Sequence, residues 1–381
     1  MTPEQTIAAI YLSILSSPAK IGLYDNIGRD PLEIKSRIKE SECIIQEHIA
    51  GFYGRDPIKA SESIAEKCYS KSISVVVYND DGYPPLLREI HRPPVVLYTK
   101  GNLSFKKTVS IVGTRNSDRI SEDITLKISS SLSDAGYSIV SGMAYGIDRF
   151  AHLGALNSGG KTIGILPGGI DTIYPYRNRD IYKMISESGV SGLISEYPPG
   201  IQSGQKWTFA QRNRIISGIS PALVVIQAPK GSGAMITARY AIEQNRDVFV
   251  CSGHAFDENY GGCHELIRDG ASIVSQVEDI LSVIDPEYKM AERGSGSETS
   301  GKTGEILINA GRVTVEKQVK PDFSLYTGIE RDLLESVFSG ITDIDLFTRK
   351  HSFSPDTVLR AITALEIEGV ITRKGNKIVM K

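Results

Sequence analysis

The sequence lacks the long apolar runs of a membrane protein and the paired cysteines of a disulfide framework. None of its apolar stretches approaches the roughly 18–20 residues that a membrane-spanning helix needs. The four cysteines are scattered, without the CxxC spacing typical of zinc cages. Residues 1–20 have no basic segment ahead of an apolar core, as a secretory signal would have. We therefore expect a cytoplasmic protein without membrane contact, disulfides or a bound metal.

Excess charge of one sign is missing as well. The 43 Lys and Arg residues nearly balance 45 Asp and Glu residues, for a formal net charge of −2. Binding to nucleic acid would therefore have to depend on a local basic patch. No serine lies in a GxSxG turn, and no set of nucleophile, base and orienting residue is visible. We expect a binding protein that is not an enzyme and uses no cofactor.

Strands and helices alternate between Val109 and Ile284, which predicts an α/β fold with a Rossmann-like, doubly wound and mostly parallel sheet. Two further β-branched or apolar runs precede it, at Ser74–Tyr78 and Val95–Tyr98. The expected strands are Val109–Val112, Tyr137–Val140, Thr162–Leu166, Gly192–Ser195, Ala222–Ile226, Asp247–Val250 and Ser272–Val274. The expected helices are Ser121–Ala135, Ile147–Leu156, Arg179–Ser186, Ala210–Ser217, Ala234–Gln244 and His264–Arg268.

Composition divides the 381 residues into four parts. Residues 1–70 have helix-like spacing of Ile and Leu and predict an N-terminal helical domain ahead of the Rossmann-like domain at 71–285. Residues 286–324, rich in Gly and Ser at their start, predict a flexible linker. Residues 325–381 predict a winged helix-turn-helix: three helices, the last capped by Ser354, and a terminal hairpin. Such modules bind DNA or protein partners.

Four glycine-containing turns follow strands of the expected sheet. The first combines the free backbone of Gly113 with the hydroxyl of Thr114 and the planar guanidinium of Arg115. The second is Ser141–Gly146, which includes Gly142. The third is Pro167–Asp171, and the fourth is Lys230–Gly233, with Gly231, Ser232 and Gly233. Carboxyl ends of parallel strands meet at one edge of a sheet, so we expect the turns to line one crevice that receives an anion.

Aromatic residues alternate with basic residues in two segments beside these turns. The first, after the third turn, reads YPYRNR and includes Arg177 and Asn178. The second, KWTFAQRNR at 206–214, contains Lys206, Phe209, Arg212 and Asn213. Cations for phosphates and rings for bases are the combination that single-stranded nucleic acid binding requires.

Structural roles for the same residues remain open. Trp207 and Phe209 could be core aromatics, which is the commoner fate of such rings. Arg115 could pair with a surface carboxylate, and Arg212 and Arg214 with Glu196 or Asp171.

Two phosphate-binding patterns are present without the context they need. A literal phosphate-loop match runs from Gly296 to Thr303, but no buried strand precedes it, so we expect no ATPase. The turn Ser141–Gly146 resembles a dinucleotide fingerprint with the wrong glycine spacing, and no acidic residue ends the following strand. Cys263 beside His264 is the one cysteine position that suggests reactivity or metal binding.

The motif order resembles that of the DNA-processing protein A (DprA/Smf) family over roughly residues 80–285. The motifs are IVGTR, SGMAYGID, ILPGGIDTIYPYRN, SEYPPG, FAQRNRIISGIS, GSGAMITARYAIEQNRDVFV and LIRDGA. The resemblance implies a homodimer that binds single-stranded DNA without sequence preference, protects incoming strands and loads RecA recombinase in natural transformation. By motif position it implies strand contacts from Arg115, Lys206, Phe209 and Asn213, and a pocket lined by Ser141 and Gly142.

The alternative function is a nucleotide-processing enzyme of the lysine-decarboxylase-like phosphoribohydrolase type. That group has a similar sheet and also carries a Pro-Gly-Gly turn. It needs Gly-Thr and a glutamate after the turn, whereas Ile170–Tyr174 supplies neither. The residues we predict to bind DNA are Gly113, Thr114, Arg115, Ser141, Gly142, Arg177, Asn178, Lys206, Phe209, Arg212, Asn213, Gly231, Ser232 and Gly233.

Overall fold

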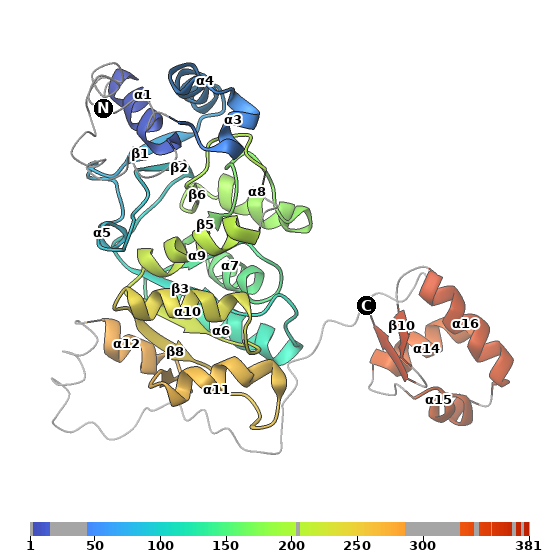
Figure 1. Ribbon diagram of the computed structural model, residues 1–381. Coiled ribbons are helices and arrows are strands. Elements are labelled where there is room, and N and C mark those ends of the chain that lie inside the picture. Colours follow the sequence, from blue (N-terminus) through green and yellow to red (C-terminus); the bar gives the residue numbers. More distant parts are fainter. Residues whose placement is uncertain are drawn as a thin grey trace, which may run out of the picture. The chain divides into compact units, whose positions relative to one another are not determined.

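The computed structural model describes residues 3–15, 44–202, 206–285, 328–338, 343–351, 353–367, 371–374 and 377–380. The chain forms two compact units, residues 1–298 and 299–381 (Figure 1). The predicted linker at 286–324 and the phosphate-loop match lie outside the described residues, and the four-part domain division stays a prediction. Among the described helices, none combines the length and apolar character needed to span a bilayer.

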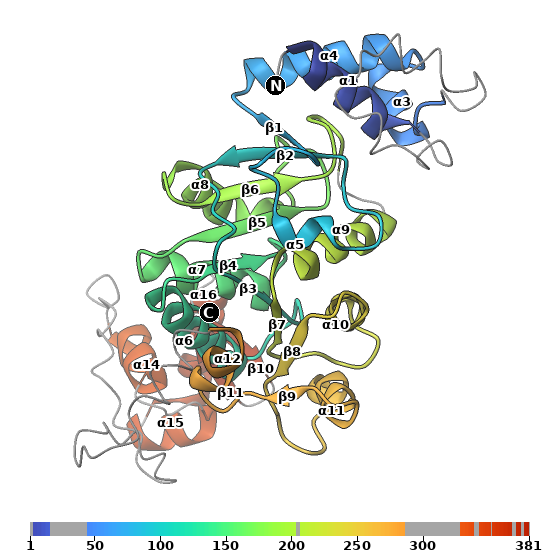
Figure 2. The ribbon, with the colours of Figure 1, turned by 90° about the vertical axis from the view of Figure 1, so that its left-hand side faces the viewer.

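The first unit contains a 9-stranded sheet of order β1-β2-β6-β5-β4-β3-β7-β8-β9 (Figure 2). Neighbours from β6 through β9 are parallel, whereas β2 is antiparallel to both β1 and β6. The predicted mostly parallel, Rossmann-like sheet is confirmed. The strands are β1 (Ser74–Val77), β2 (Val96–Gly101), β3 (Thr108–Val112), β4 (Ser138–Ser141), β5 (Thr162–Leu166), β6 (Gly192–Ser195), β7 (Ala222–Val225), β8 (Asp247–Val250) and β9 (Ser272–Ile273).

The chain winds outward from β3 in both directions. It passes first to β4, β5 and β6 on one side, and then to β7, β8 and β9 on the other. Figure 2 shows the strands in spatial order from β1 at the top to β9 at the bottom. The winding therefore reverses between β3 and β7, and ligands of open α/β sheets bind outside the carboxyl ends of strands at such a point.

Helices cover both faces of the sheet. Val109 and Ile111 of β3 belong to the buried apolar cluster between the sheet and the helices on one face. Val112 belongs to the buried apolar cluster between the sheet and the helices on the other face. Burial on both faces explains why this strand is a continuous apolar run. The first layer is α6 (Arg119–Asp134), α7 (Ile147–Asn157), α8 (Arg179–Glu187) and α12 (Glu278–Ile284). The second is α5 (Pro85–Arg88), α9 (Lys206–Ile219), α10 (Gly233–Glu243) and α11 (Gly261–Arg268).

Among the helices expected around the sheet, α9 differs most from its predicted start. We expected a helix at Ala210–Ser217, but α9 begins at Lys206. The segment with alternating rings and cations is therefore helical. Residues three or four apart share a helix face, so Phe209, Arg212 and Asn213 lie on the same side of α9.

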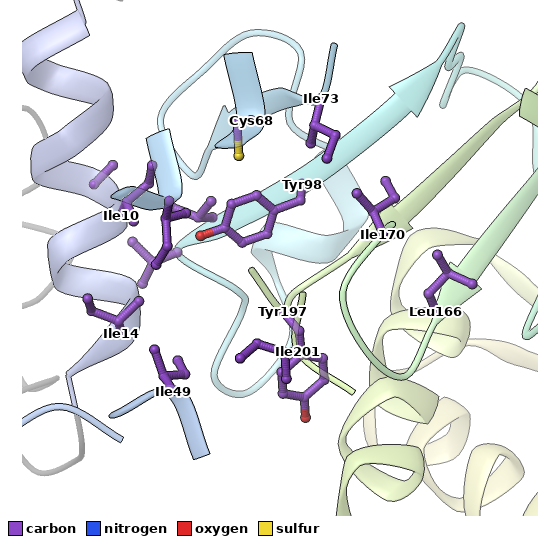
Figure 3. Packing of buried hydrophobic residues seen from close by; sticks show 14 of the residues in the cluster. Ile10, Ile14, Ile49, Cys68, Ile73, Tyr98, Leu166, Ile170, Tyr197 and Ile201 are labelled. Atoms are coloured by element: carbon purple, nitrogen blue, oxygen red, sulfur yellow. The ribbon is translucent and has the colours of Figure 1, made fainter. Parts of the chain in front are cut away.

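Three N-terminal helices pack on the β1 edge of the sheet. They are α1 (Pro3–Ile14), α3 (Glu47–Tyr53) and α4 (Pro57–Ser70), and they share one buried apolar cluster with β1, β2 and α8. Figure 3 shows Tyr98 extending from β2 toward Ile10 of α1, close to Cys68 of α4. The Tyr53 hydroxyl donates to the carbonyl of Pro199, in the loop after β6. The helices and the sheet thus share one core.

The second unit has its own core. Its described elements are α14 (Gly328–Phe338), α15 (Ile344–His351), α16 (Pro355–Ile367), β10 (Ile371–Lys374) and β11 (Lys377–Met380). Leu333, Phe347, Ile362 and Ile378 meet in a buried cluster. The predicted hairpin is present, since β10 and β11 pair antiparallel. Ser354 caps α16 as predicted, because its hydroxyl accepts from the Thr357 amide at 3.3 Å.

Candidate functional site

A pocket opens at the carboxyl ends of β3, β4 and β5. Its space, including the part open to solvent, is about 280 Å³. It is lined by Arg115, Gly142, Ala144, Tyr145, Pro167, Tyr174, Pro175, Phe209 and Arg212. The lining thus joins three of the four predicted turns to α9. The fourth, Lys230–Gly233, contributes no lining residue among those described, but Asn213 of α9 donates from Nδ2 to the Gly233 carbonyl at 3.3 Å.

Arg115, Phe209 and Tyr174 form the mouth of the pocket. Arg115 is exposed, and its guanidinium carbon lies 5.0 Å from the centroid of the Phe209 ring. The Tyr174 ring centroid lies 5.5 Å from that of Phe209, at an interplanar angle of 58°. Phe209 is half-buried and remains accessible, so it is not an ordinary core ring. A guanidinium beside two accessible rings can bind a phosphate and an adjoining base.

Arg212 lies beneath the mouth and is only 4% exposed. Its Nη1 donates to the carbonyl of Gly142, after β4, and to that of Ile165, in β5, at 3.0 Å for the latter. Asp148 is buried beside it and accepts from the Ala144 amide at 3.3 Å. Arg212 thereby connects the second turn to strand β5. A direct contact of Arg212 with DNA stays a prediction.

Burial dominates the electrostatics of this pair. It lowers the pKa of Arg212 to about 10 and raises the pKa of Asp148 above its ordinary value. The opposite charge of each group counteracts the effect of burial on the other. Because a buried charge is costly without a partner, the two residues depend on each other for the ionised form.

The second turn is fixed by buried polar contacts. The Ser141 hydroxyl donates to the Ile111 carbonyl at 2.7 Å and ties β4 to β3. A Cβ on Gly142 would lie 1.8 Å from Arg212 Nη1, so this position has no room for a side chain. Met143 has a φ of 60°, a left-handed conformation that is costly for a residue other than glycine. Such strain persists only where surrounding contacts enforce it. Here the side-chain Nδ2 of Asn178 donates to the Met143 carbonyl at 2.9 Å.

The first turn is held from two sides. A Cβ on Gly113 would lie 2.4 Å from Ile147 Cγ1, so glycine permits the close approach of α7. The Thr114 amide donates to the Gln227 carbonyl at 2.7 Å, while its hydroxyl accepts from the Asn116 amide at 3.2 Å. These two hydrogen bonds of Thr114 fix the backbone directly before Arg115.

The remaining predicted residues lie around the pocket. Arg177 is exposed on a short 3₁₀ turn, η3 (Tyr176–Asn178). Gly231 and Gly233 are exposed, and Ser232 precedes the first turn of α10. Lys206 begins α9, but its side chain and that of Trp207 lie outside the described residues.

The structure decides two of the alternative pairings. Arg214 donates from Nη2 to both carboxylate oxygens of Glu196, each at 2.6 Å, as the structural alternative predicted. Asp171 pairs instead with Lys71 of the N-terminal segment and accepts from the Gly200 amide at 2.6 Å. Asp171 thus stabilises the third turn.

Cys263 and His264 do not gather a metal-ligand set. Cys263 is fully buried, burial raises the pKa of its thiol to about 11, and its sulfur lies 3.9 Å from the Ile226 carbonyl oxygen. His264 Nε2 lies 3.4 Å from the Gly253 carbonyl oxygen. Within the described ranges, no three His, Cys, Asp or Glu side chains are grouped as a metal site.

Sequence reasoning left two features of the site unassigned. Tyr174 was visible as a ring after the third turn, and its contact with Phe209 makes it part of the mouth. Asp148 was visible as the acidic end of the motif SGMAYGID, but nothing in the sequence indicated a buried arginine beside it.

His152, on α7 behind the site, gives a testable pH dependence. It is fully buried, with Nδ1 2.7 Å from the Thr162 hydroxyl. Burial and then the charge of Arg212 lower its pKa from 6.5 to about 3. The unfolded chain therefore binds this proton near pH 6.5 and the folded chain only near pH 3, so stability falls as pH decreases through that window. We expect His152 to account for a loss of about 1.5–2 kcal/mol between pH 6.5 and 5.

Urea denaturation at several pH values measures this effect. The variant His152→Gln should lose that part of the pH dependence, whereas His91→Gln, at an exposed position, should retain it. Identical pH dependence in both variants would refute the assignment to His152.

The open, mostly parallel sheet and the pocket at the carboxyl ends of its strands define a Rossmann-like protein whose site suits an anionic ligand with stacking groups. The chain belongs to the DNA recombination-mediator protein A family, whose profile matches residues 74–285. The family predicted from the motif order is thereby confirmed.

Known proteins of this family resemble the chain over much of its length. It is 38% identical to DNA processing protein DprA of Bacillus subtilis over 243 residues, 60% of this chain and 81% of that protein. The structure of DprA from Streptococcus pneumoniae aligns with a TM-score of 0.56 and 31% identity, over 74% of this chain and 93% of that one. A Helicobacter pylori structure, described for the single-stranded DNA binding mode of that protein, aligns with a TM-score of 0.50 and 26% identity, over 58% and 96%.

Proposed function

We propose that this protein binds single-stranded DNA without sequence preference in the pocket, protects incoming strands and loads RecA recombinase onto them. The process would be natural transformation or another form of DNA recombination, and the protein would act as a cytoplasmic homodimer. The observation that carries the proposal is the guanidinium of Arg115 over the accessible ring of Phe209.

The chemistry of the pocket supports binding to a single strand. A guanidinium binds phosphate in every nucleotide, and an aromatic ring stacks on any base. The ring faces needed for stacking are available in an unpaired strand, whereas a duplex covers them with neighbouring bases. The single-stranded DNA binding described for the Helicobacter pylori relative supports the same ligand.

The second unit supports a further part of the proposal. The three helices of its described residues, followed by an antiparallel hairpin, have the order of a winged helix-turn-helix. We propose that fold for residues 325–381, with duplex DNA or a protein as its partner.

The phosphoribohydrolase alternative would need an available carboxylate, a glutamate in that group, directly after the Pro-Gly-Gly part of the third turn. Asp171 is the carboxylate in that position, and it is held by Lys71 and the Gly200 amide. It is therefore a structural residue of the turn, which favours a binding protein over an enzyme.

Fluorescence anisotropy of labelled oligo-dT and of a matching duplex, at two or more salt concentrations, tests the ligand. We expect tight, salt-dependent binding to the single strand. Arg115→Ala should weaken it for all sequences and reduce the salt slope by roughly one unit, because one phosphate contact is lost. The control Arg55→Ala removes the same charge from an exposed position outside the pocket lining.

Two results would reject the proposal. If the wild type does not bind single strands, single-stranded DNA is not the ligand. If Arg115→Ala and Arg55→Ala bind with equal affinity, the pocket is not the binding site. RecA loading is tested separately, as the rate of RecA ATP hydrolysis on a strand precoated with single-strand-binding protein, with and without this protein.

A further inference from the structure

A second pair of ring and guanidinium lies just outside the pocket. Tyr176 opens η3 directly after the pocket residue Pro175. Tyr176 is 66% exposed, and the guanidinium carbon of Arg179 lies 5.0 Å from its ring centroid. The arrangement repeats that of Arg115 over Phe209, where the same distance is 5.0 Å.

Tyr174 connects the two pairs. Tyr174 is 38% exposed and stands two residues before Tyr176, and its ring centroid lies 5.5 Å from that of Phe209. The accessible rings of Phe209, Tyr174 and Tyr176 therefore follow one another from the pocket onto the outer loop. A series of rings is the usual platform for successive bases of a single strand.

The outer loop is held rigidly against the second turn. Asn178 is 2% exposed, and its Nδ2 donates to the carbonyls of Met143 and Ala144, each at 2.9 Å. Arg149 donates to Asn178 Oδ1 at 3.1 Å and to both carboxylate oxygens of Asp180, at 2.9 and 2.5 Å. A loop fixed in this way loses little conformational freedom when a ligand binds.

The charges on this loop favour a phosphate. Arg177 and Arg179 are both exposed and carry guanidinium groups that match phosphate geometry. The neighbouring carboxylate, Asp180, stays ionised, because the hydrogen bond from Arg149 lowers its pKa to about 2. Its negative charge is offset by Arg149, so it does not cancel the charge of the two outer arginines.

We propose that Tyr176, Arg177 and Arg179 form an outer subsite for a nucleotide of the strand that leaves the pocket. The base stacks on the face of Tyr176 that Arg179 does not cover, and the guanidinium groups bind the adjoining phosphate. The inference rests on the proposed single-strand binding and extends the binding path beyond the pocket.

Photocrosslinking locates the subsite directly. Oligo-dT strands carrying one 5-iodouracil at successive positions are irradiated with the full-length protein, and crosslinked peptides are identified by mass spectrometry. We expect crosslinks to Phe209 from one position and to Tyr176 from a position a few nucleotides away. Crosslinks to Phe209 with none to Tyr176 at any position would overturn the subsite and leave the pocket intact.

Affinity against strand length provides an independent test. Tyr176→Ala should weaken binding of long oligo-dT by about five- to a hundredfold, the loss typical of one stacked base, and leave the shortest bound strands unaffected. Tyr176→Phe should bind like the wild type. Tyr69→Ala, which removes a 91% exposed ring on α4, is the matched control.

The outcomes separate the two proposals. If Arg115→Ala lowers the affinity for single strands while Tyr176→Ala and Tyr69→Ala have the same affinity at every strand length, the outer subsite alone is rejected. Equal losses on short and long strands would also reject it, since Tyr176 would then act through the shape of the pocket. No single-strand binding by the wild type rejects the proposed function and the subsite together.

Discussion

Replacing Arg212 by methionine is expected to lower the free energy of unfolding by about 3–5 kcal/mol. The substitution keeps most of the side-chain volume but removes the charge that faces buried Asp148. It also removes the donor to the Gly142 and Ile165 carbonyls. The change is measured by urea denaturation near neutral pH.

A double variant separates the charge from the hydrogen bonds. Asp148→Asn combined with Arg212→Met removes both buried charges, and it should recover part of the lost stability because no uncompensated charge remains. Arg214→Met is the matched control, since Arg214 pairs with Glu196 at a partly exposed position. A loss no greater than that of the control would show that Arg212 does not act as the buried connection between the second turn and β5.

Phe209→Ala is expected to weaken single-strand binding by about 1–3 kcal/mol with little change in the salt slope. The ring supplies stacking and carries no charge, so its removal leaves the number of phosphate contacts unchanged. Fluorescence anisotropy over a range of salt concentrations measures both quantities.

Phe209→Leu is the informative comparison. Leucine fills most of the half-buried space but offers no aromatic face, so it should bind DNA as weakly as the alanine variant while keeping the fold. Normal binding by Phe209→Leu, or a salt slope that falls with either variant, would show that the residue supports Arg115 and does not stack on a base.

The parallel strands from β3 to β9 could be predicted to within one residue, because buried parallel strands are continuous β-branched runs ended by glycine turns. The start of α9 could not be predicted in this way. Its first residues, Lys206 to Phe209, look like a binding loop because polar and aromatic residues dominate, and packing against the sheet decides that they are helical.

Two of the three residues at the mouth of the pocket were also predictable, since Arg115 and Phe209 follow recognisable turn and ring patterns. The burial of Arg212 could not be predicted from the sequence. Its acceptors, Gly142 and Ile165, lie 70 and 47 residues away in sequence, and only the parallel pairing of β4 and β5 brings them to α9. A sequence shows the cation but not the carbonyl groups that fix it.

The apolar cluster shared by the N-terminal helices and the β1 edge of the sheet makes the two parts one cooperative folding unit. Tyr98 and its neighbours belong to both, and Lys71 and Tyr53 reach loops that follow β5 and β6. Detachment of the N-terminal helices from the sheet would expose the apolar face of β1 and β2. It would also break the contact of Lys71 with the third turn of the pocket. Amides of α1 and β2 should therefore exchange their hydrogens in the same global event, and the pocket should keep its shape only as long as the helices stay docked.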